Sequence, residues 1–242
     1  MYLYQFQLLQ AVDKEKCLRH GIFPRADKSN RSLNVDPDLP GYEHGEVLRC
    51  RKKIVRELGL SREAYVSQNH GNIVLRADSG GVIGHGDGIM TNRAGLGLMI
   101  KVADCQPVLF FAPKQKVAAA VHCGWRGALR GILQNTMLAF RTVYSVEAND
   151  LFVGIGPSLG PCCAKFSSPY QEFPESLHEF IMTNNKVDLW RMSSTMLVAC
   201  GIPKEQIEIA KICTACNNDT WFSFRGDASD QQGRFAAVIG LV

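Results

Sequence analysis

The chain has 242 residues, a formal net charge of +4 and an ordinary share of charged side chains, 21%. This length suits one domain with a substantial core, and the weak, dispersed positive charge argues against a nucleic-acid-binding protein. No run approaches the roughly 18 apolar residues of a spanning helix, and the N-terminus lacks the features of a secretory leader. Nine cysteines, an odd number, favour reduced thiols over a disulfide framework. We therefore expect a cytoplasmic protein that does not act at a membrane.

The first third of the chain alternates short elements with turn-rich sequence. We predict an edge strand at residues 21–23, a loop at 26–45, a helix from Glu46 that ends at Gly59, and a strand at 73–75. Arg25, at the mouth of the loop, is placed to face a ligand. His70 precedes Gly71 at a strand margin, where a ligand can reach it, although an isolated histidine of this kind is more often structural. A glycine-rich loop around His85 and Asp87 is expected to shape a pocket without supplying a ligand.

Residues 96–130 carry the strongest functional signal. Two apolar runs, at 96–102 and 117–121, predict strands, and the first is followed by Cys105 while the second leads into His122. Neighbouring strands lie roughly 5 Å apart, so this thiol and this imidazole would reach one metal ion if the two strands are neighbours. A helix predicted to start near Arg126 and to continue through 128–143 would direct its N-terminal N–H groups at the same place. That arrangement favours an anion such as phosphate.

The C-terminal half supplies further elements and two open questions. We predict strands at 151–156, 207–212 and 235–242, helices at 171–183 and 189–200, and a rigid turn at 157–163.

A closed four-cysteine zinc site is not expected, because the CxxC pair at 213–216 has no second CxxC and the adjacent cysteines at 162–163 are poor substitutes. Cys105 and His122 are compatible with two chemistries. The thiolate either coordinates a metal ion or acts as a nucleophile with His122 as its base.

Several motifs together resemble one known family. They are NHGN (69–72), GDGIMT (86–91), ADCQPVLF (103–110), VHCGWRG (121–127), GPSLGPCC (156–163), CTACNNDTWFSFRGD (213–227) and GRFAAVIGL (233–241). This pattern, which covers nearly the whole chain, is similar to the laccase-domain or YfiH-type family. That family was first described as multicopper polyphenol oxidoreductases and is now understood as zinc-dependent purine nucleoside enzymes.

The resemblance, together with strand–helix alternation around 96–143, implies an α+β fold. We expect a single compact domain over residues 1–242, with mixed β-sheets covered by helices, similar to the CNF and YfiH folds. The implied reaction is phosphorolysis of purine nucleosides (adenosine, inosine, guanosine and methylthioadenosine) to base and pentose 1-phosphate, accompanied by adenosine deamination. In deamination, zinc would activate water for attack on the purine ring. Small molecules, and no protein partner, are the expected ligands.

The resemblance also assigns site residues. The implied zinc ligands are His70, Cys105 and His122. The expected catalytic residues are Cys105, His122, Arg225 and Arg25, with the two arginines balancing the phosphate. Contacts to the substrate are expected from Gln68, Asp104, Gly124 and Arg126.

The chain departs from the family pattern at both arginines. Arg25 is followed by Ala26-Asp27 where the family usually has two glycines, and Arg225-Gly226-Asp227 stands where Arg-Arg-Asp is common. A shift towards deamination and a different phosphate contact are both consistent with the second change. Three other functions remain open: a copper-dependent polyphenol oxidase, a Cys/His amidohydrolase and a silent metal-binding protein. Copper is disfavoured because the chain has six histidines and no HxH arrangement.

Overall fold

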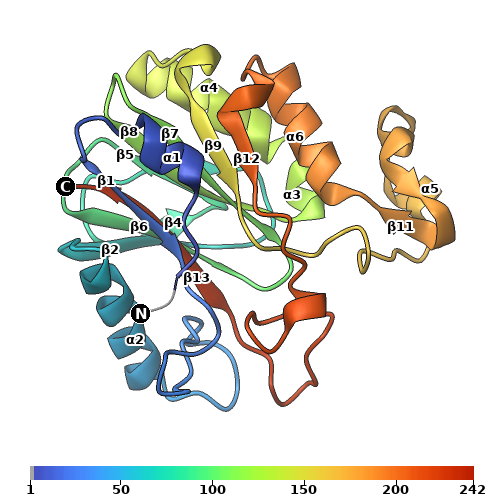
Figure 1. Ribbon diagram of the computed structural model, residues 1–242, viewed down its shortest axis with the longest axis horizontal. Coiled ribbons are helices and arrows are strands. Elements are labelled where there is room, and N and C mark those ends of the chain that lie inside the picture. The colour runs from blue at the N-terminus through green and yellow to red at the C-terminus, as the bar shows by residue number, and fades with distance from the viewer. Residues whose placement is uncertain (1–2) are drawn as a thin grey trace.

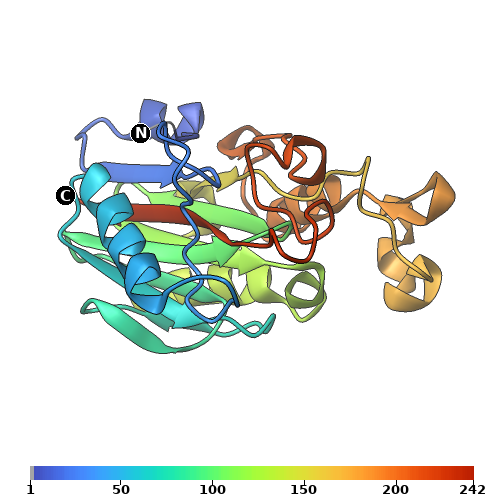
Figure 2. The same ribbon diagram turned by 90° about the horizontal axis from the view of Figure 1, so that it is seen from below.

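Two β-sheets packed face to face form the centre of the molecule, and helices cover their outer faces (Figures 1 and 2). The computed structural model describes residues 3–242, so Met1 and Tyr2 of the predicted domain lie outside the described residues. The expected α+β architecture, with mixed sheets covered by helices, is confirmed. No helix among the described residues is long and apolar enough to cross a membrane.

The two sheets differ in size and both mix parallel with antiparallel pairs. The five-stranded sheet has the order β1-β13-β6-β2-β4, and its strands are β1 (Leu18–Ile22), β13 (Phe235–Leu241), β6 (Leu96–Val102), β2 (Arg62–Ser67) and β4 (Gly81–His85). The six-stranded sheet has the order β12-β9-β7-β8-β5-β3, and its strands are β12 (Ile207–Ile209), β9 (Phe152–Ile155), β7 (Gln106–Ala112), β8 (Val117–Cys123), β5 (Gly88–Thr91) and β3 (Val74–Arg76). A separate hairpin joins β10 (Ile181–Met182) to β11 (Lys186–Val187).

Alternation of side chains along the strands builds four layers. Ile100 of β6 and Phe111 of β7 point into the core between the sheets. Met99, the neighbour of Ile100, faces α2 (His44–Glu57) on the other side of the five-stranded sheet. Phe110 packs against Phe140 on the outer face of the six-stranded sheet. Because successive strand residues point to opposite faces, each apolar run serves two cores at once.

Most helices belong to the outer layers. Those on or near the six-stranded sheet are α1 (Gln7–Val12), α3 (Trp125–Leu129), α4 (Ile132–Tyr144) and α6 (Leu189–Ala199). Helix α5 (Pro169–Glu172) and the β10–β11 hairpin extend away from the sheets (Figure 1). Five short 3-10 helices are η1 (Ala148–Asp150), η2 (Glu175–Phe180), η3 (Thr183–Asn185), η4 (Lys204–Gln206) and η5 (Ala215–Asn217).

Two predicted helices are wrong in extent. The helix expected from Arg126 through residue 143 is two helices, because Gly131 adopts a left-handed conformation (φ 83°) that ends α3 and begins α4. The helix expected at 171–183 is replaced by α5, η2 and β10. Pro174 is the cause, since the preceding Phe173 is extended (φ −115°, ψ 140°), as residues before proline prefer.

The chain passes from the five-stranded to the six-stranded sheet through three connections. They are residues 68–73 between β2 and β3, 86–87 between β4 and β5, and 103–105 between β6 and β7. Each is short, so all three lie where the two sheets meet. This seam holds His70, Asp87 and Cys105.

Candidate metal centre and active-site cavity

Three side chains from distant parts of the sequence converge at the seam between the sheets. His70 lies in the 68–73 connection, Cys105 directly precedes β7, and His122 is near the end of β8. Antiparallel pairing of β7 with β8 places Pro107 opposite His122, which brings Cys105 close to that histidine. The strands at 96–102 and 117–121 are not neighbours in one sheet, because β6 and β8 belong to different sheets. Strand β7, which the sequence analysis missed, makes the connection.

The three side chains are close enough to share one ion. One ligand atom from each of His70, Cys105 and His122 lies within 4.8 Å of the others. Cys105 Sγ is 3.8 Å from His70 Nε2, and the two imidazole rings are nearly perpendicular with centroids 4.8 Å apart. Three protein ligands with a fourth position left open are the arrangement typical of catalytic zinc sites, and imidazole and thiolate are among the ligands that zinc takes.

Asp87 orients the His122 side chain. No orienting role was predicted for Asp87 from the sequence. Its fully buried carboxylate lies 2.7 Å from His122 Nδ1 and accepts backbone N–H groups of residues 69–71. Because an ionised carboxylate only accepts hydrogen bonds, His122 Nδ1 carries a proton, and Nε2 is the nitrogen left to a metal ion, which would displace the proton there on binding. The local sequence signal for Asp87 was limited to its place in the glycine-rich loop.

The surrounding groups favour the ionised forms of both Cys105 and Asp87. Burial would raise the pKa of the Cys105 thiol, but the neighbouring His122 and His70 lower it to about 6. Burial would lower the pKa of His122, but Cys105 and Asp87 raise it to about 9. Burial likewise opposes ionisation of Asp87, and the bonds from His122 and Gly71 outweigh it, so its pKa is lowered. A thiolate is therefore available near neutral pH, either as a metal ligand or as a nucleophile.

The backbone at this centre is strained. His70 and Asp104 both have positive φ angles (59° and 77°), which non-glycine residues seldom adopt. A Cβ atom at Gly124 would lie 3.0 Å from Cys105 Sγ and 3.0 Å from His70 Cδ2. The absence of a side chain at Gly124 therefore lets the backbone lie close to Cys105 and His70, and the substrate contact expected from Gly124 stays a prediction. Strain of this kind persists only where the surrounding structure holds it, and it gathers at functional sites.

The three ligands open onto a cavity of about 560 Å³, a volume typical of small-molecule sites. Trp125, Phe166 and Phe224 contribute aromatic surface to its lining. Arg126, Arg225 and Arg234 also line it, and none of these arginines forms an ion pair within residues 3–242. Arg126 instead stacks on the Trp125 ring, with its Cζ atom 4.2 Å from the centroid. The cavity therefore combines apolar surface with available positive charge.

Besides the three candidate metal ligands, four of the predicted residues line this cavity, and three of these four have polar groups that bond to the protein. The Gln68 amide exchanges two hydrogen bonds with the backbone of Lys101. The Asp104 carboxylate accepts from the hydroxyls of Thr214 and Ser223 and from the backbone N–H of Arg225. Arg126 and Arg225 also line the cavity, and the Arg225 guanidinium donates to the carbonyls of Cys163 and Lys165. Asp104 thus positions the C-terminal loop that carries Arg225.

Arg25 is not at the cavity. Its guanidinium forms an ion pair with Asp227 at 2.9 Å, donates to the Asn218 carbonyl and lies over the Phe222 ring. It joins the N-terminal loop to the C-terminal loop, and the structure does not bring Arg25 to the residues that line the cavity. Arg234, which directly precedes the last strand, occupies the cavity instead. Arg234 was not predicted as a site residue, since nothing in the neighbouring sequence separates it from other surface arginines.

Comparisons with known proteins agree with this picture. Residues 19–242 match the family model described as multi-copper polyphenol oxidoreductase laccase. Among curated relatives, purine nucleoside phosphorylase YlmD from Geobacillus stearothermophilus is 29% identical over 230 residues (86% of this chain, 83% of the relative). Purine nucleoside phosphorylase YfiH from Shigella flexneri is 29% identical over 220 residues, which are 87% of each chain.

A solved structure shares the fold. The crystal structure of YlmD from Geobacillus stearothermophilus superposes with a TM-score of 0.82 and 27% identity, over 93% of this chain and 92% of that one. The family model spans nearly the whole sequence, including all the residues of the metal centre. The chain therefore belongs to the multi-copper polyphenol oxidoreductase laccase family, whose YfiH and YlmD members it resembles in sequence and in fold.

Proposed function

We propose that this protein is a zinc-dependent purine nucleoside phosphorylase that converts a nucleoside and phosphate to a free purine and a pentose 1-phosphate. The observation that carries the proposal is the three-ligand centre His70–Cys105–His122 at a cavity lined by three arginines without carboxylate partners. The printed names of the relatives support the same activity. A cavity of about 560 Å³ has room for a nucleoside beside a phosphate ion.

Zinc fits the centre better than copper does. The donor set contains one thiolate and two imidazoles, and Asp87 fixes the orientation of His122 as a carboxylate does behind many zinc-bound histidines. A multicopper oxidase needs several histidines in close pairs. Among the described residues the remaining four histidines lie outside this cluster, and the second group of metal-capable side chains holds only cysteines. When bound, zinc would act as a Lewis acid and polarise a substrate group.

Different residues of the chain would bind the two substrates of phosphorolysis. The cationic side chains of Arg126, Arg225 and Arg234 would hold phosphate, whose oxygen attacks the anomeric carbon of the ribose. As that C–O bond forms, the bond to the purine nitrogen breaks and its electron pair leaves with the base, which takes up a proton. The aromatic surface of Trp125, Phe166 and Phe224 would hold the purine. The substitution of glycine at 226 leaves the cavity with three arginines, so loss of the second family arginine is compatible with phosphate binding.

Product analysis tests the proposal directly. Purified, zinc-loaded protein is incubated with adenosine or inosine, with and without phosphate, and the products are separated by chromatography. We expect adenine or hypoxanthine to form only with phosphate, together with ribose 1-phosphate. Conversion of adenosine to inosine without free base would instead assign deamination alone. No turnover of either nucleoside would refute the proposal.

Replacing Arg225 by alanine is expected to raise the KM for phosphate about 10- to 100-fold and to change the KM for the nucleoside much less. The reason is that a charge-assisted hydrogen bond is worth about 1.5–3 kcal/mol and each 1.4 kcal/mol is about a factor of ten. Initial rates at varied phosphate measure the effect.

Two other arginines serve as comparisons. Arg25→Ala removes the competing candidate and should leave the KM for phosphate unchanged, although loss of its ion pair with Asp227 lowers stability. Arg141, exposed on α4 and 3.6 Å from Glu147, is a neutral surface control. An increase in the KM for phosphate with Arg25→Ala, but not with Arg225→Ala, would reverse the assignment.

A thiol-dependent hydrolase is the second candidate, and one observation favours it. Asp87, His122 and Cys105 stand in the order of an orienting acid, a base and a nucleophile. In that case Cys105 would be alkylated by iodoacetamide even when the protein is saturated with zinc. Protection of Cys105 by zinc favours the metal centre.

A further inference from the structure

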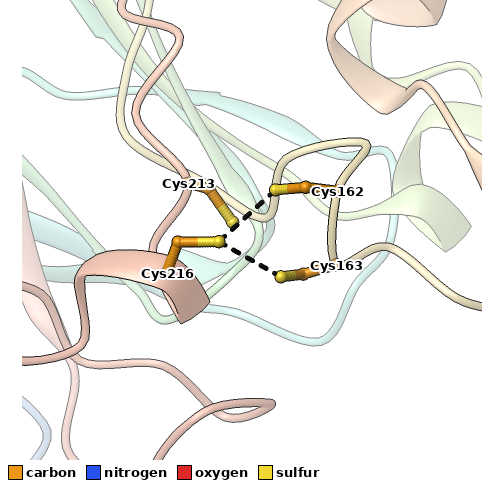
Figure 3. Close-up of side chains that lie close together, drawn as sticks. All are labelled: Cys162, Cys163, Cys213 and Cys216. Carbon is orange, nitrogen blue, oxygen red and sulfur yellow. Dashed lines mark hydrogen bonds between the residues drawn. The ribbon is translucent and has the colours of Figure 1, made fainter.

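A second cluster of four cysteines lies apart from the three-ligand centre. The sulfur atoms of Cys162, Cys163, Cys213 and Cys216 all lie within 4.8 Å of one another, and Figure 3 shows the side chains directed at a common point between two loops. Cys216 Sγ is 3.5 Å from Cys162 Sγ and 3.4 Å from Cys163 Sγ. The adjacent cysteines at 162–163, which were expected to be poor substitutes for a second CxxC, are therefore brought to the CxxC pair by the fold.

Backbone pairing explains why the two loops meet. Strands β9 and β12 are parallel neighbours, and their pairing continues past the strand ends as a bridge between Ser158 and Cys213. The N–H of Ser158 donates to the carbonyl of Ile212, and the N–H of Thr214 donates to the carbonyl of Ser158. The turn after β9 and the turn after β12 thus leave the sheet side by side. Main-chain pairing therefore brings the two cysteine pairs together.

The structure assigns a closed metal site to these four cysteines, and we propose that it binds a structural zinc ion. Four thiolates around zinc at about 2.3 Å lie about 3.8 Å from one another in a tetrahedron, close to the sulfur separations found here. Cys216 approaches both Cys162 and Cys163 to a similar extent, which suits a shared ion better than two separate S–S pairs. Cys213 and Cys216 also have the CxxC spacing common in structural zinc sites.

The surroundings of the cluster fit a thiolate site. The N–H of Gly160 donates to Cys213 Sγ at 3.3 Å, and a Cβ atom on Gly160 would lie 3.0 Å from Cys213 Cβ. Burial would raise the pKa of Cys213, but backbone donors from Gly160 and Cys216 lower it. Burial and the neighbouring thiols raise the pKa of Cys162 to about 11 and also raise that of Cys163. A dication bound at this point would ionise the thiols with release of protons.

The site would act on the active-site cavity through the loop it holds. Thr214, between Cys213 and Cys216, donates to Asp104, the residue before the zinc ligand Cys105. Arg225 donates to the carbonyl of Lys165, close behind Cys163, and its backbone N–H bonds to Asp104. A metal joining the two turns would therefore fix one wall of the cavity. It needs no open coordination position and no contact with substrate.

Metal counting on the full-length protein, prepared under reducing conditions and loaded with zinc, tests the inference. We expect about two zinc ions per chain in the natural protein and about one in the Cys162→Ser/Cys216→Ser double variant. His122→Ala should also hold about one, bound at the four cysteines. Cys200→Ser is the matched control, because Cys200 is partly buried at the end of α6 and belongs to neither cluster, and it should keep two.

Cobalt(II) replacement gives a second measurement that does not depend on how the double variant folds. In the His122→Ala protein, cobalt should produce the intense sulfur-to-metal absorption of a tetrahedral thiolate site, in about one equivalent. If cobalt added to zinc-free His122→Ala protein does not produce that absorption, the inference is overturned. Disulfide-linked peptides that join these cysteines in protein kept under reducing conditions would overturn it as well. Neither result depends on nucleoside turnover, so failure here and failure of the proposed phosphorolysis are separate outcomes.

Discussion

Replacing His122 by alanine is expected to remove the zinc ion of the three-ligand centre and to lower kcat/KM for phosphorolysis at least about a thousandfold. Lewis-acid stabilisation of a transition state is worth several kcal/mol, and each 1.4 kcal/mol is about a factor of ten in rate. In the proposed centre His122 would supply one of three protein ligands, and Asp87 holds its imidazole in place. Zinc content and steady-state rates measure the two effects. Cys105→Ala should behave in the same way.

His178→Ala is the matched control for His122→Ala. His178 lies in η2, where its Nε2 atom is 3.1 Å from the carbonyl oxygen of Phe173, and it belongs to neither metal cluster. Its replacement should leave zinc content and kcat/KM at the level of the natural protein. Full activity in the His122→Ala protein would mean that the reaction takes place elsewhere.

Replacing Asp87 by asparagine is expected to weaken zinc binding at the three-ligand centre by about 10- to 100-fold, the usual effect of losing the group that orients a metal-bound histidine. Both carboxylate oxygens accept N–H groups, Oδ1 from His70 and Oδ2 from Asn69 and Gly71. Either orientation of an amide would direct its NH₂ group at a donor, so the strained 69–71 backbone would also shift. Competition with a coloured chelator measures the affinity.

Rescue by zinc separates positioning from structural damage. If Asp87 acts through the metal, excess zinc should restore much of the lost kcat/KM of Asp87→Asn, whereas a misfolded protein would not recover. Asp78→Asn is the control, since Asp78 is an exposed carboxylate paired with Arg76 and Arg93. An unchanged zinc affinity in Asp87→Asn would remove Asp87 from the metal centre.

The spacing of apolar residues correctly predicted several strands and one helix. The apolar runs at 96–102 and 117–121 are strands with bounds close to those expected, and the helix at 189–200 is α6. The helices predicted at 126–143 and 171–183 were wrong in extent, because Gly131 and Pro174 interrupt sequences whose apolar spacing continues on both sides. Strand β7 was missed because Pro107 near its start suggested an end to regular structure, although proline is tolerated close to the beginning of a strand.

The site was only partly accessible from sequence, for reasons of topology. Cys105 and His122 stood out because each follows or ends an apolar run, while His70 needed the family resemblance. Asp87 meets His122 across 35 residues, and no spacing rule connects a carboxylate in a glycine-rich loop with that histidine. The four-cysteine cluster depends on the parallel pairing of β9 with β12, which a count of cysteine spacings cannot reveal.

The three connections that run from the five-stranded to the six-stranded sheet link formation of the metal centre to the packing of the two sheets. His70, Asp87 and Cys105 each sit on a different one of these connections, so neither sheet carries the centre by itself. Assembly of the binding site and docking of the sheets are consequently one event. A ligand that binds only the docked state at 100 times its dissociation constant stabilises that state by about 2.7 kcal/mol. A metal ion bound at this centre would therefore stabilise the packing of the two sheets, and we expect removal of the metal to lower the free energy of unfolding.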